Sequence, residues 1–264
     1  MNQIGSDDAH RMIGRQGRSR LRVTLAMPAV AVALAFGTGI ARAQTTEPPG
    51  DTVYPGPARR VARVVAPAWA SELERDRTGE ADRVMDLLRI GPGVRVADLG
   101  AGAGYYTMRV ARRLGGVGTV YAEDIDPAYL AELQARLNAE GFVSVQTVLG
   151  RPGDPALPPA SVDVALLSHM YHEITDPFGF LARLVPALAP GARVGVVDLE
   201  RPILSHGTPL ALLRCEMAAV GYEFEDVYQL IPSEGYLAVF TPPDSPPPPS
   251  AVHPCGDQSP PNHG

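Results

Sequence analysis

VRVADLGAGAGYYT, residues 94–107, places a short buried strand, a glycine loop and the start of a helix next to one another. The loop has a glycine at every second position: Gly100, Gly102 and Gly104. Glycines let backbone N–H groups approach a ligand at a helix N-terminus. The dinucleotide-binding fingerprint requires GxGxxG, and Tyr105 stands where its third glycine would be. The spacing therefore disfavours a nicotinamide enzyme.

Strand and helix patterns alternate on both sides of this loop. The predicted strands cover residues 95–99, 119–124, 143–149, 162–167 and 194–198, with helical patterns between them. Strands that alternate with helices indicate a parallel sheet with right-handed crossovers. Two last strands, 222–231 and 235–240, are separated by only three residues, which requires antiparallel pairing. Five parallel strands closed by a hairpin differ from the ending of a dinucleotide dehydrogenase.

A carboxylate ends the second strand, about 20 residues past the glycine loop. In YAEDID, residues 121–126, Asp124 can accept hydrogen bonds from both hydroxyls of a ribose. Asp126 is better explained as the cap of the following helix, and Glu123 should point to the opposite side. We predict that Asp124 binds ribose; the alternative is a solvated acid.

Four segments together resemble one known family. VRVADLGAGAGYYT, VYAEDIDP, SVDVALL and LAPGARVGVVD resemble, in order and spacing, the class I S-adenosylmethionine-dependent methyltransferases over roughly residues 89–240. The resemblance implies an α/β fold, a Rossmann-like three-layer sandwich. Its sheet would be mostly parallel and seven-stranded, in the order 3-2-1-4-5-7-6 with a C-terminal antiparallel hairpin.

The resemblance also implies S-adenosylmethionine as the cofactor. The three loop glycines would lie against its methionine part, Asp98 would hold its amino group, and Ile125 would pack on adenine beside the ribose ligand Asp124. The further cofactor-binding residues that we predict are Ala101, Tyr105 and Arg151. Arg151 is a departure, because many family members have an acid there that reads the adenine amino group, and arginine cannot accept that hydrogen bond. Backbone carbonyls or Asp154 could substitute.

The chain reads SHMYHE, residues 168–173, after the fourth strand. Carboxyl ends of parallel strands face the ligand crevice, so these side chains could reach a methyl acceptor. We predict His172 as the catalytic base, ahead of His169, and Tyr171 as its neighbour in an acceptor pocket; the alternative is a histidine that only bonds a loop. A metal would need a further ligand that the sequence does not identify, so we predict no metal site.

The first 43 residues have the pattern of an export signal. Five arginines precede an uncharged stretch, 23–41, which ends in Ala41-Arg42-Ala43. We expect cleavage after Ala43 and a periplasmic or secreted protein. An uncleaved anchor remains the alternative, since the stretch approaches the roughly 20 residues that span a bilayer; the membrane would then be contacted only through this segment. Met12 could equally be the start.

We divide the chain into the signal peptide or anchor (1–43), an irregular arm (44–70), the methyltransferase domain (71–241) and a disordered Pro-rich tail (242–264). Cys215 lies on a predicted apolar helix and Cys255 in the tail. We expect a buried thiol and a free tail thiol, although export would permit a disulfide.

The net charge of residues 44–264 indicates which class of methyl acceptor the protein can bind. Residues 44–264 carry 17 arginines, no lysine and 27 acidic residues, and this excess of negative charge repels nucleic acid. We therefore predict methyl transfer to a small-molecule acceptor. The alternative is an exported binding or interaction module that keeps the cofactor fold without turnover, because S-adenosylmethionine is made in the cytoplasm.

Overall fold

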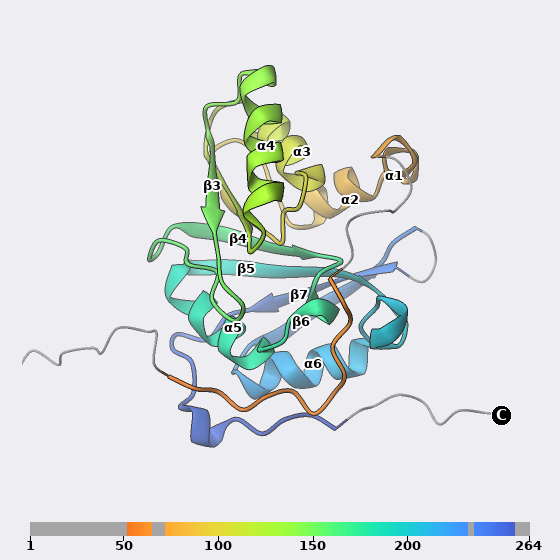
Figure 1. Cartoon of the computed structure of the whole chain (residues 1–264), viewed down its shortest axis with the longest axis vertical. Helices are drawn as coiled ribbons and strands as arrows, with labels where there is room; N and C mark the ends of the chain where they lie inside the picture. Colours follow the sequence, from red (N-terminus) through yellow and green to blue (C-terminus); the bar gives the residue numbers. More distant parts are fainter. Residues whose placement is uncertain (1–51, 65–71, 232–234, 257–264) are drawn as a thin grey trace, which may run out of the picture. The chain divides into compact units, whose positions relative to one another are not determined.

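The computed structural model describes residues 52–64, 72–231 and 235–256, so the predicted export signal lies outside the described residues. These residues form one seven-stranded sheet in the order β3-β2-β1-β4-β5-β7-β6 (Figure 1). Its strands are β1 (Arg95–Leu99), β2 (Thr119–Asp124), β3 (Val145–Leu149), β4 (Val162–Ser168), β5 (Leu188–Leu199), β6 (Glu223–Gln229) and β7 (Gly235–Thr241). The predicted fold class, strand order and C-terminal hairpin are confirmed.

The pairing directions place the carboxyl ends of five strands along one edge. β1 to β5 pair in parallel, whereas β7 pairs antiparallel with both β5 and β6. The chain order reverses at β1, which has β2 on one side and β4 on the other. A crevice opens at such a switch point, outside the carboxyl ends of the strands.

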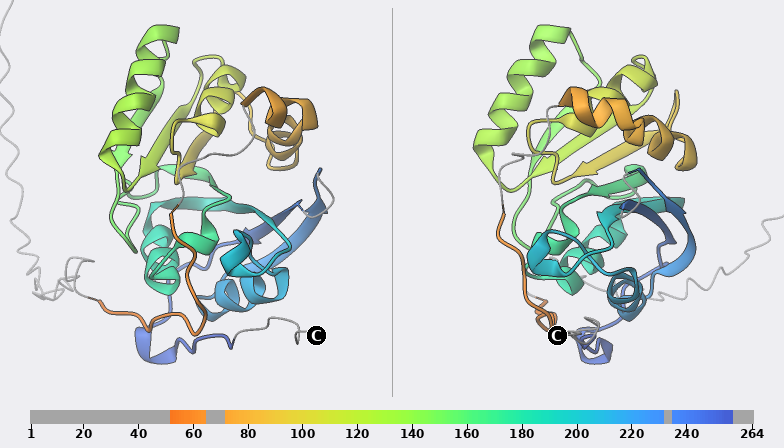
Figure 2. Two further views of the ribbon diagram at one scale, coloured as in Figure 1. Left: turned by 45° about the vertical axis from the view of Figure 1, so that its right-hand side comes forward. Right: turned by 90° about the vertical axis from the view of Figure 1, so that its right-hand side faces the viewer.

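Helices cover both faces of the sheet, as the views in Figures 1 and 2 show. One face carries α2 (Glu80–Leu87), α3 (Tyr105–Leu114) and α4 (Pro127–Glu140); the other carries α5 (Pro177–Leu184) and α6 (Leu210–Ala219). A short α1 (Glu72–Thr78) precedes α2. The result is a three-layer sandwich with one apolar core on each side of the sheet.

Local sequence sets where the helices begin and end. The Asp126 carboxylate accepts a hydrogen bond of 2.8 Å from the Ala128 N–H, which confirms its role as the cap of α4. Asp176 caps α5 in the same way through the Gly179 N–H. Pro186 ends α5 rather than kinking it, because the chain continues as the 3₁₀ turn η2 (Val185–Ala187) and then as β5.

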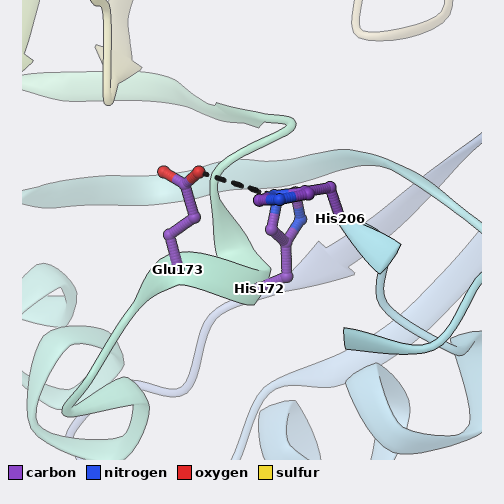
Figure 3. A group of neighbouring side chains, drawn as sticks. All are labelled: His172, Glu173 and His206. Carbon is purple, nitrogen blue, oxygen red and sulfur yellow. Dashed lines mark ion pairs between the residues drawn. The ribbon is translucent and has the colours of Figure 1, made fainter. Parts of the chain in front are cut away.

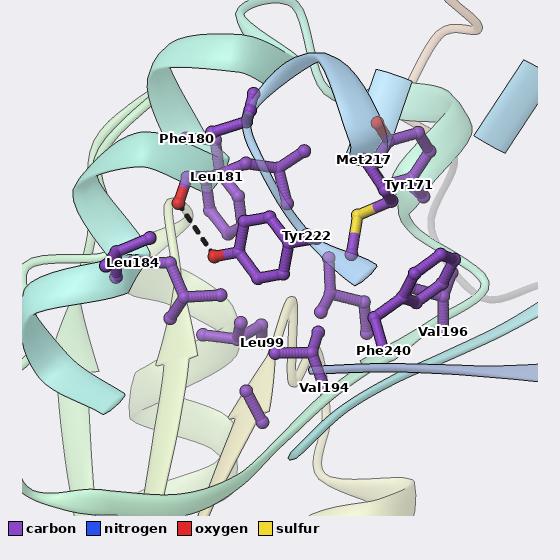
Figure 4. Close-up of a cluster of buried hydrophobic side chains, with 14 of the residues drawn as sticks. Leu99, Tyr171, Phe180, Leu181, Leu184, Val194, Val196, Met217, Tyr222 and Phe240 are labelled. Atoms are coloured by element: carbon purple, nitrogen blue, oxygen red, sulfur yellow. Dashed lines mark hydrogen bonds between the residues drawn. The ribbon is translucent and has the colours of Figure 1, made fainter. Parts of the chain in front are cut away.

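A closely packed apolar core lies between the sheet and the helices α5 and α6 (Figure 4). Strand side chains such as Leu99, Val194 and Val196 pack there against Leu181 of α5 and Met217 of α6. Each fully buried side chain of this kind contributes about 1.5–3 kcal/mol. The Tyr222 hydroxyl, also buried, donates to the Leu181 carbonyl at 2.9 Å. The loops at the strand ends therefore rise from closely packed elements.

The C-terminal segment corrects two predictions. Cys255 forms a disulfide with Cys215 of α6, and Val252 is buried in the core beneath α5 and α6. A 3₁₀ turn, η4 (Pro249–Ala251), lies just before them. The predictions of disorder from residue 242 and of a free Cys255 thiol are thus wrong over residues 242–256. A cross-link between cysteines 40 residues apart restricts the unfolded chain, and proline content does not reveal it.

The arm contributes to the core although residues 52–64 contain no helix or strand. Arg59 is buried and its Nε donates to the Glu216 carboxylate at 2.9 and 3.1 Å. The Ala62 N–H donates to the His172 carbonyl at 3.0 Å, which ties the arm to the turn after β4. Among the described helices, none is long and apolar enough to cross a membrane.

Candidate cofactor and acceptor site

A cavity of about 800 Å³ opens at the carboxyl ends of the parallel strands. This is within the range of about 300–1,000 Å³ that is usual for small-molecule sites. The loops after β1, β2, β3, β4 and β5 all contribute to its wall, and α1 and α2 close one side. It is the place that the strand order and the glycine loop predict for a ligand.

The glycine loop forms one wall with its backbone exposed to the cavity. Gly100, Gly102 and Gly104 all have positive φ, at 66°, 53° and 92°. A Cβ on Gly104 would lie 2.3 Å from Leu133 Cδ1 of α4, whereas a Cβ on Gly102 would meet nothing within 4 Å. Gly104 is therefore required by packing, and Gly102 leaves the backbone open beside the ligand space.

Asp98 lies at the end of β1, buried, on the cavity wall. Its carboxylate accepts a 2.6 Å hydrogen bond from the Thr107 hydroxyl of α3. Burial raises its pKa to about 6, and the Thr107 hydrogen bonds only partly oppose this. An ammonium group beside it would favour the charged form, so the residue fits the predicted role toward the cofactor's amino group.

Asp124, the residue predicted to bind the ribose, lies at the end of β2. Its Oδ1 accepts from the Asp126 N–H at 2.9 Å, and its Oδ2 accepts from the Gly102 N–H at 2.8 Å. Each carboxylate oxygen has a second lone pair that a hydroxyl can use. The next residue, Ile125, has a half-exposed side chain on the cavity wall, where an adenine ring could pack.

Glu123 does not point away from the cavity as expected. It lines the wall, and its Oε2 accepts from the Gly100 N–H at 3.3 Å. A Cβ on Gly150 would lie 1.8 Å from Glu123 Oε1. The Glu123 side chain therefore fits only because residue 150 is a glycine. Burial, followed by the charges of Asp124 and Asp98, raises the pKa of Glu123 to about 8. An uncharged, buried carboxyl group thus lies between the tips of β1 and β3.

The other predicted cofactor residues lie on the same wall. Ala101 donates its N–H to the Glu123 carbonyl at 2.8 Å. The Tyr105 ring lies between the guanidinium groups of Arg75 and Arg109, 3.6 and 3.7 Å from its centroid. Arg151 pairs with Asp154 at 2.7 Å, so the acid that could substitute in adenine recognition already has a partner.

The acceptor end of the cavity is built on η1 (Tyr171–Glu173), the 3₁₀ turn after β4. His172 is buried, and its Nδ1 lies 3.1 and 3.2 Å from the two carboxylate oxygens of Asp198. Asp198, near the end of β5, is fully buried and also accepts from the Leu199 N–H and the Thr208 hydroxyl. A carboxylate so placed only accepts, so His172 Nδ1 donates and Nε2 keeps its lone pair.

Tyr171 does not share the cavity with His172, and its predicted place in the acceptor pocket is wrong. Its side chain is fully buried in the core that Figure 4 shows, and its hydroxyl donates to Glu216 at 2.9 Å. A 3₁₀ helix has three residues per turn, so neighbouring side chains point in different directions. Burial, together with the charge of Glu216, raises the pKa of Tyr171 well above its usual value.

A second buried carboxylate on this side was not found from the sequence. Glu80, the first residue of α2, accepts from the Tyr106 hydroxyl at 2.8 Å and lies 3.5 Å from His169 Nε2. Burial opposes its charge, but His169 and Arg75 outweigh this and lower the pKa of Glu80 to about 2. Asp198 was missed too, although an acid at the end of a buried strand, in VVDLE, was a usable signal.

Comparison with known proteins shows a similarity to one family over part of the chain. Residues 96–191 match the family described as a methyltransferase domain, and these residues include the glycine loop, Asp124 and η1. Residues 96–191 are thus similar to class I methyltransferase domains, and the sheet has the strand order that this similarity implies. This similarity indicates S-adenosylmethionine as the cofactor, and the chemistry of the loop glycines, Asp98 and Asp124 is compatible with it.

Two curated relatives match part of this chain. Nocamycin O-methyltransferase from Saccharothrix syringae is 34% identical over 122 residues, which are 46% of this chain and 44% of that protein. Aklanonic acid methyltransferase DauC from Streptomyces sp. (strain C5) is 27% identical over 126 residues, 48% of this chain and 56% of that protein. The chain thus spans about half the length of the curated relatives it matches.

A solved structure has a similar fold. The crystal structure of a SAM dependent methyltransferase from Aquifex aeolicus superposes with a TM-score of 0.56 at 19% identity, over 65% of this chain and 98% of that chain. At this identity the likeness concerns the fold alone.

Proposed function

We propose that this protein transfers a methyl group from S-adenosylmethionine to a small-molecule acceptor held in front of His172. The observation that carries the proposal is a single cavity. It joins the glycine loop and Asp124 at one end to His172 at the other. A methyl donor and an acceptor could therefore lie side by side in one cavity.

Bound S-adenosylmethionine supplies a methyl group already activated by the positive sulfonium. The protein's part is to hold and orient: Asp98 binds the ammonium group and Asp124 the ribose hydroxyls. His172 Nε2 accepts the proton that an oxygen or nitrogen acceptor loses on attacking the methyl carbon, while the electron pair of the carbon–sulfur bond goes to sulfur. Asp198 orients the imidazole through Nδ1 and stabilises its protonated form.

A small acceptor is favoured over a macromolecule. The two curated relatives carry the names of small organic compounds, nocamycin and aklanonic acid. The excess of acidic residues disfavours nucleic acid. The alternative of a binding module without turnover would leave the buried His172–Asp198 pair without a use in the cavity.

Export also belongs to the proposal. The arginine-rich start and the uncharged stretch up to Ala43 support secretion or a periplasmic location. The Cys215–Cys255 disulfide supports it as well, because such bonds persist in oxidising compartments. N-terminal sequencing of the exported protein would show whether Gln44 is the mature start.

The test combines cofactor binding with transfer. Calorimetry should show binding of S-adenosylmethionine and of its demethylated product, and a radiolabelled methyl group should pass to a compound in a small-molecule extract. His172→Gln should bind the cofactor like the wild type but lower turnover at least about 100-fold. Cofactor binding without transfer to any extract component would favour the binding module instead. Unchanged turnover of His172→Gln would remove His172 from the mechanism.

A further inference from the structure

Two loops that are far apart in the sequence bring three metal-ligating side chains together at the acceptor end (Figure 3). His172 and Glu173 come from η1, and His206 follows η3 (Ile203–Ser205), the turn after β5. Glu173 Oε1 lies 3.9 Å from His172 Nε2 and 4.0 Å from His206 Nδ1. One ligand atom from each residue lies within 4.8 Å of the other two.

The nitrogen of His172 that faces this group is in the state that a metal needs. Its Nδ1 donates to Asp198, so the lone pair is on Nε2, toward Glu173. Histidines that bind metals in proteins usually donate their other ring N–H to a carboxylate or carbonyl in this way. Asp198 itself is fixed by the Leu199 N–H and the Thr208 hydroxyl, so the ring orientation is set in advance.

The nitrogen of His206 supplies an independent observation. Its Nδ1 atom is buried and has no hydrogen-bond partner among the described residues, since 4.0 Å to Glu173 is too long. An unsatisfied buried polar atom costs about 1–3 kcal/mol. His206 also has φ of +53°, and a Cβ on the following Gly207 would lie 2.5 Å from the Leu199 carbonyl oxygen. His206 thus adopts a left-handed backbone conformation that few non-glycine residues have, and glycine at position 207 avoids a clash with the Leu199 carbonyl.

The spacing suits a small ion after a modest contraction. Zinc binds nitrogen and oxygen ligands at about 2.0–2.2 Å in a tetrahedron, which sets neighbouring ligand atoms about 3.4 Å apart. The separations of 3.9 and 4.0 Å to Glu173 Oε1, and of at most 4.8 Å between the two histidine nitrogens, need these atoms to approach one another by about 0.5–1.5 Å. Two imidazoles and one carboxylate favour zinc or a similar transition metal over magnesium or calcium, which prefer oxygen.

We propose that His172, Glu173 and His206 bind one divalent transition-metal ion, of which zinc is the type, at the acceptor end of the cavity. Three protein ligands leave a fourth position open, as in catalytic rather than structural zinc sites. His172 and Glu173 line the cavity, so an ion bound by them would be accessible from the space for the acceptor. The metal site would revise the prediction of no metal, which rested on the sequence offering no third ligand.

Only the use of the ion rests on the proposed function. An acceptor hydroxyl at the open position would lose its proton through coordination, because a bound divalent ion lowers the pKa of a ligated oxygen. With the ion bound, His172 Nε2 would be a ligand instead of the base described under the proposed function, and the released proton would pass to water. Occupancy by the ion would select acceptors that present an oxygen, such as alcohols or phenols.

The experiment measures metal binding and cofactor binding separately on the full chain. Chelator-treated protein is titrated with Co²⁺, followed by its visible absorption, and then with Zn²⁺ in competition. We expect one equivalent of Co²⁺ with a tetrahedral spectrum, displaced by Zn²⁺. His206→Ala should weaken binding at least about 100-fold, and Asp198→Asn about 10–100-fold. The matched control is His253→Ala, because His253 is exposed and outside the group; it should bind like the wild type.

The outcomes separate the two proposals. Absence of stoichiometric Co²⁺ or Zn²⁺ binding, or equal binding by the wild type and His206→Ala, would overturn the metal site even if S-adenosylmethionine binds and methyl transfer proceeds. Metal binding that depends on His206 in a protein that does not bind the cofactor would support the site and overturn the proposed function. If His206→Ala does not fold by circular dichroism, Glu173→Gln provides the same comparison.

Discussion

The two ends of the cavity differ in how their residues are brought together. At the cofactor end, Asp98, the glycine loop and Asp124 lie within one strand–helix–strand unit, residues 95–124. At the acceptor end, His172 meets Asp198 and His206 only because β4 and β5 are neighbours in the sheet. A site built within one unit leaves a spacing pattern in the sequence, and a site built between distant loops does not.

The largest expected effect tests the cofactor end. Asp124→Ala removes a carboxylate that can accept two hydroxyl hydrogen bonds, and charge-assisted hydrogen bonds contribute about 1.5–3 kcal/mol each. We expect S-adenosylmethionine affinity to fall roughly 1,000-fold, equivalent to about 4 kcal/mol, as measured by calorimetry. The matched control is Asp126→Ala two residues later, which should lose about 1 kcal/mol of stability as a helix cap and keep its affinity. Equal affinities of Asp124→Ala and Asp126→Ala for S-adenosylmethionine would show that Asp124 does not bind the ribose.

The sequence predicted the fold well because strands, helices and the hairpin leave local signals, and the predictions for the cofactor end rest on signals of the same local kind. Strand periodicity and the short hairpin connection predicted parallel strands with an antiparallel ending, and the family resemblance implied the strand order; the structure confirms both. Asp126 was identified as a cap from its place before Pro127. These features need only neighbours within a turn or two of the chain.

The remaining errors come from contacts that sequence spacing does not encode. Tyr171 and His172 are adjacent, yet the 3₁₀ turn sends one into the core and the other toward the cavity. Glu123 reaches the cavity because Gly150, on another strand's loop, leaves room for it. The pairing of Cys255 with Cys215 joins segments on either side of the hairpin.

Glu123 gives the cofactor end a dependence on pH that its spacing pattern did not show. Its pKa in the folded protein is about 8, above the ordinary value of 4.5. Between these values the unfolded chain has lost the proton and the folded protein keeps it, so stability falls as pH rises from about 4.5 to 8 and then levels off. Glu123→Gln removes this loss, because the amide stays uncharged and can accept from the Gly100 N–H.

Thermal or urea unfolding should therefore show Glu123→Gln stabilised relative to the wild type, increasingly from pH 5 to pH 8. The difference should reach about 3 kcal/mol near pH 7.5. Glu132→Gln on the exposed side of α4 is the matched control and should follow the wild type at every pH. A constant difference between Glu123→Gln and the wild type across this range would show that the carboxyl group is not held uncharged.

Protonation of Asp98 at acidic pH should lower the affinity for S-adenosylmethionine. Its raised pKa of about 6 means that the carboxylate is mostly protonated at pH 5, and a neutral carboxyl group cannot pair with the cofactor's ammonium group. We expect affinity to drop about tenfold between pH 7 and pH 5, measured by calorimetry. Asp98→Asn should bind more weakly at pH 7 but with a flatter profile. A wild-type profile as flat as that of Asp98→Asn would contradict the assigned contact.

The smallest expected effect sharpens the contrast within the acceptor end itself. Tyr171→Phe removes the hydroxyl that donates to Glu216, but Glu216 keeps its buried partner Arg59 and the ring still fills the core. Loss of one hydrogen bond should lower the free energy of unfolding by about 1 kcal/mol, measured in urea. Turnover should stay within about twofold of the wild type, whereas the adjacent His172→Gln loses most of it. If Tyr171→Phe instead lowered turnover as much as His172→Gln, the Tyr171 hydroxyl would contribute to the reaction as well as to the core. Tyr171 would then belong to the acceptor end of the cavity, together with His172.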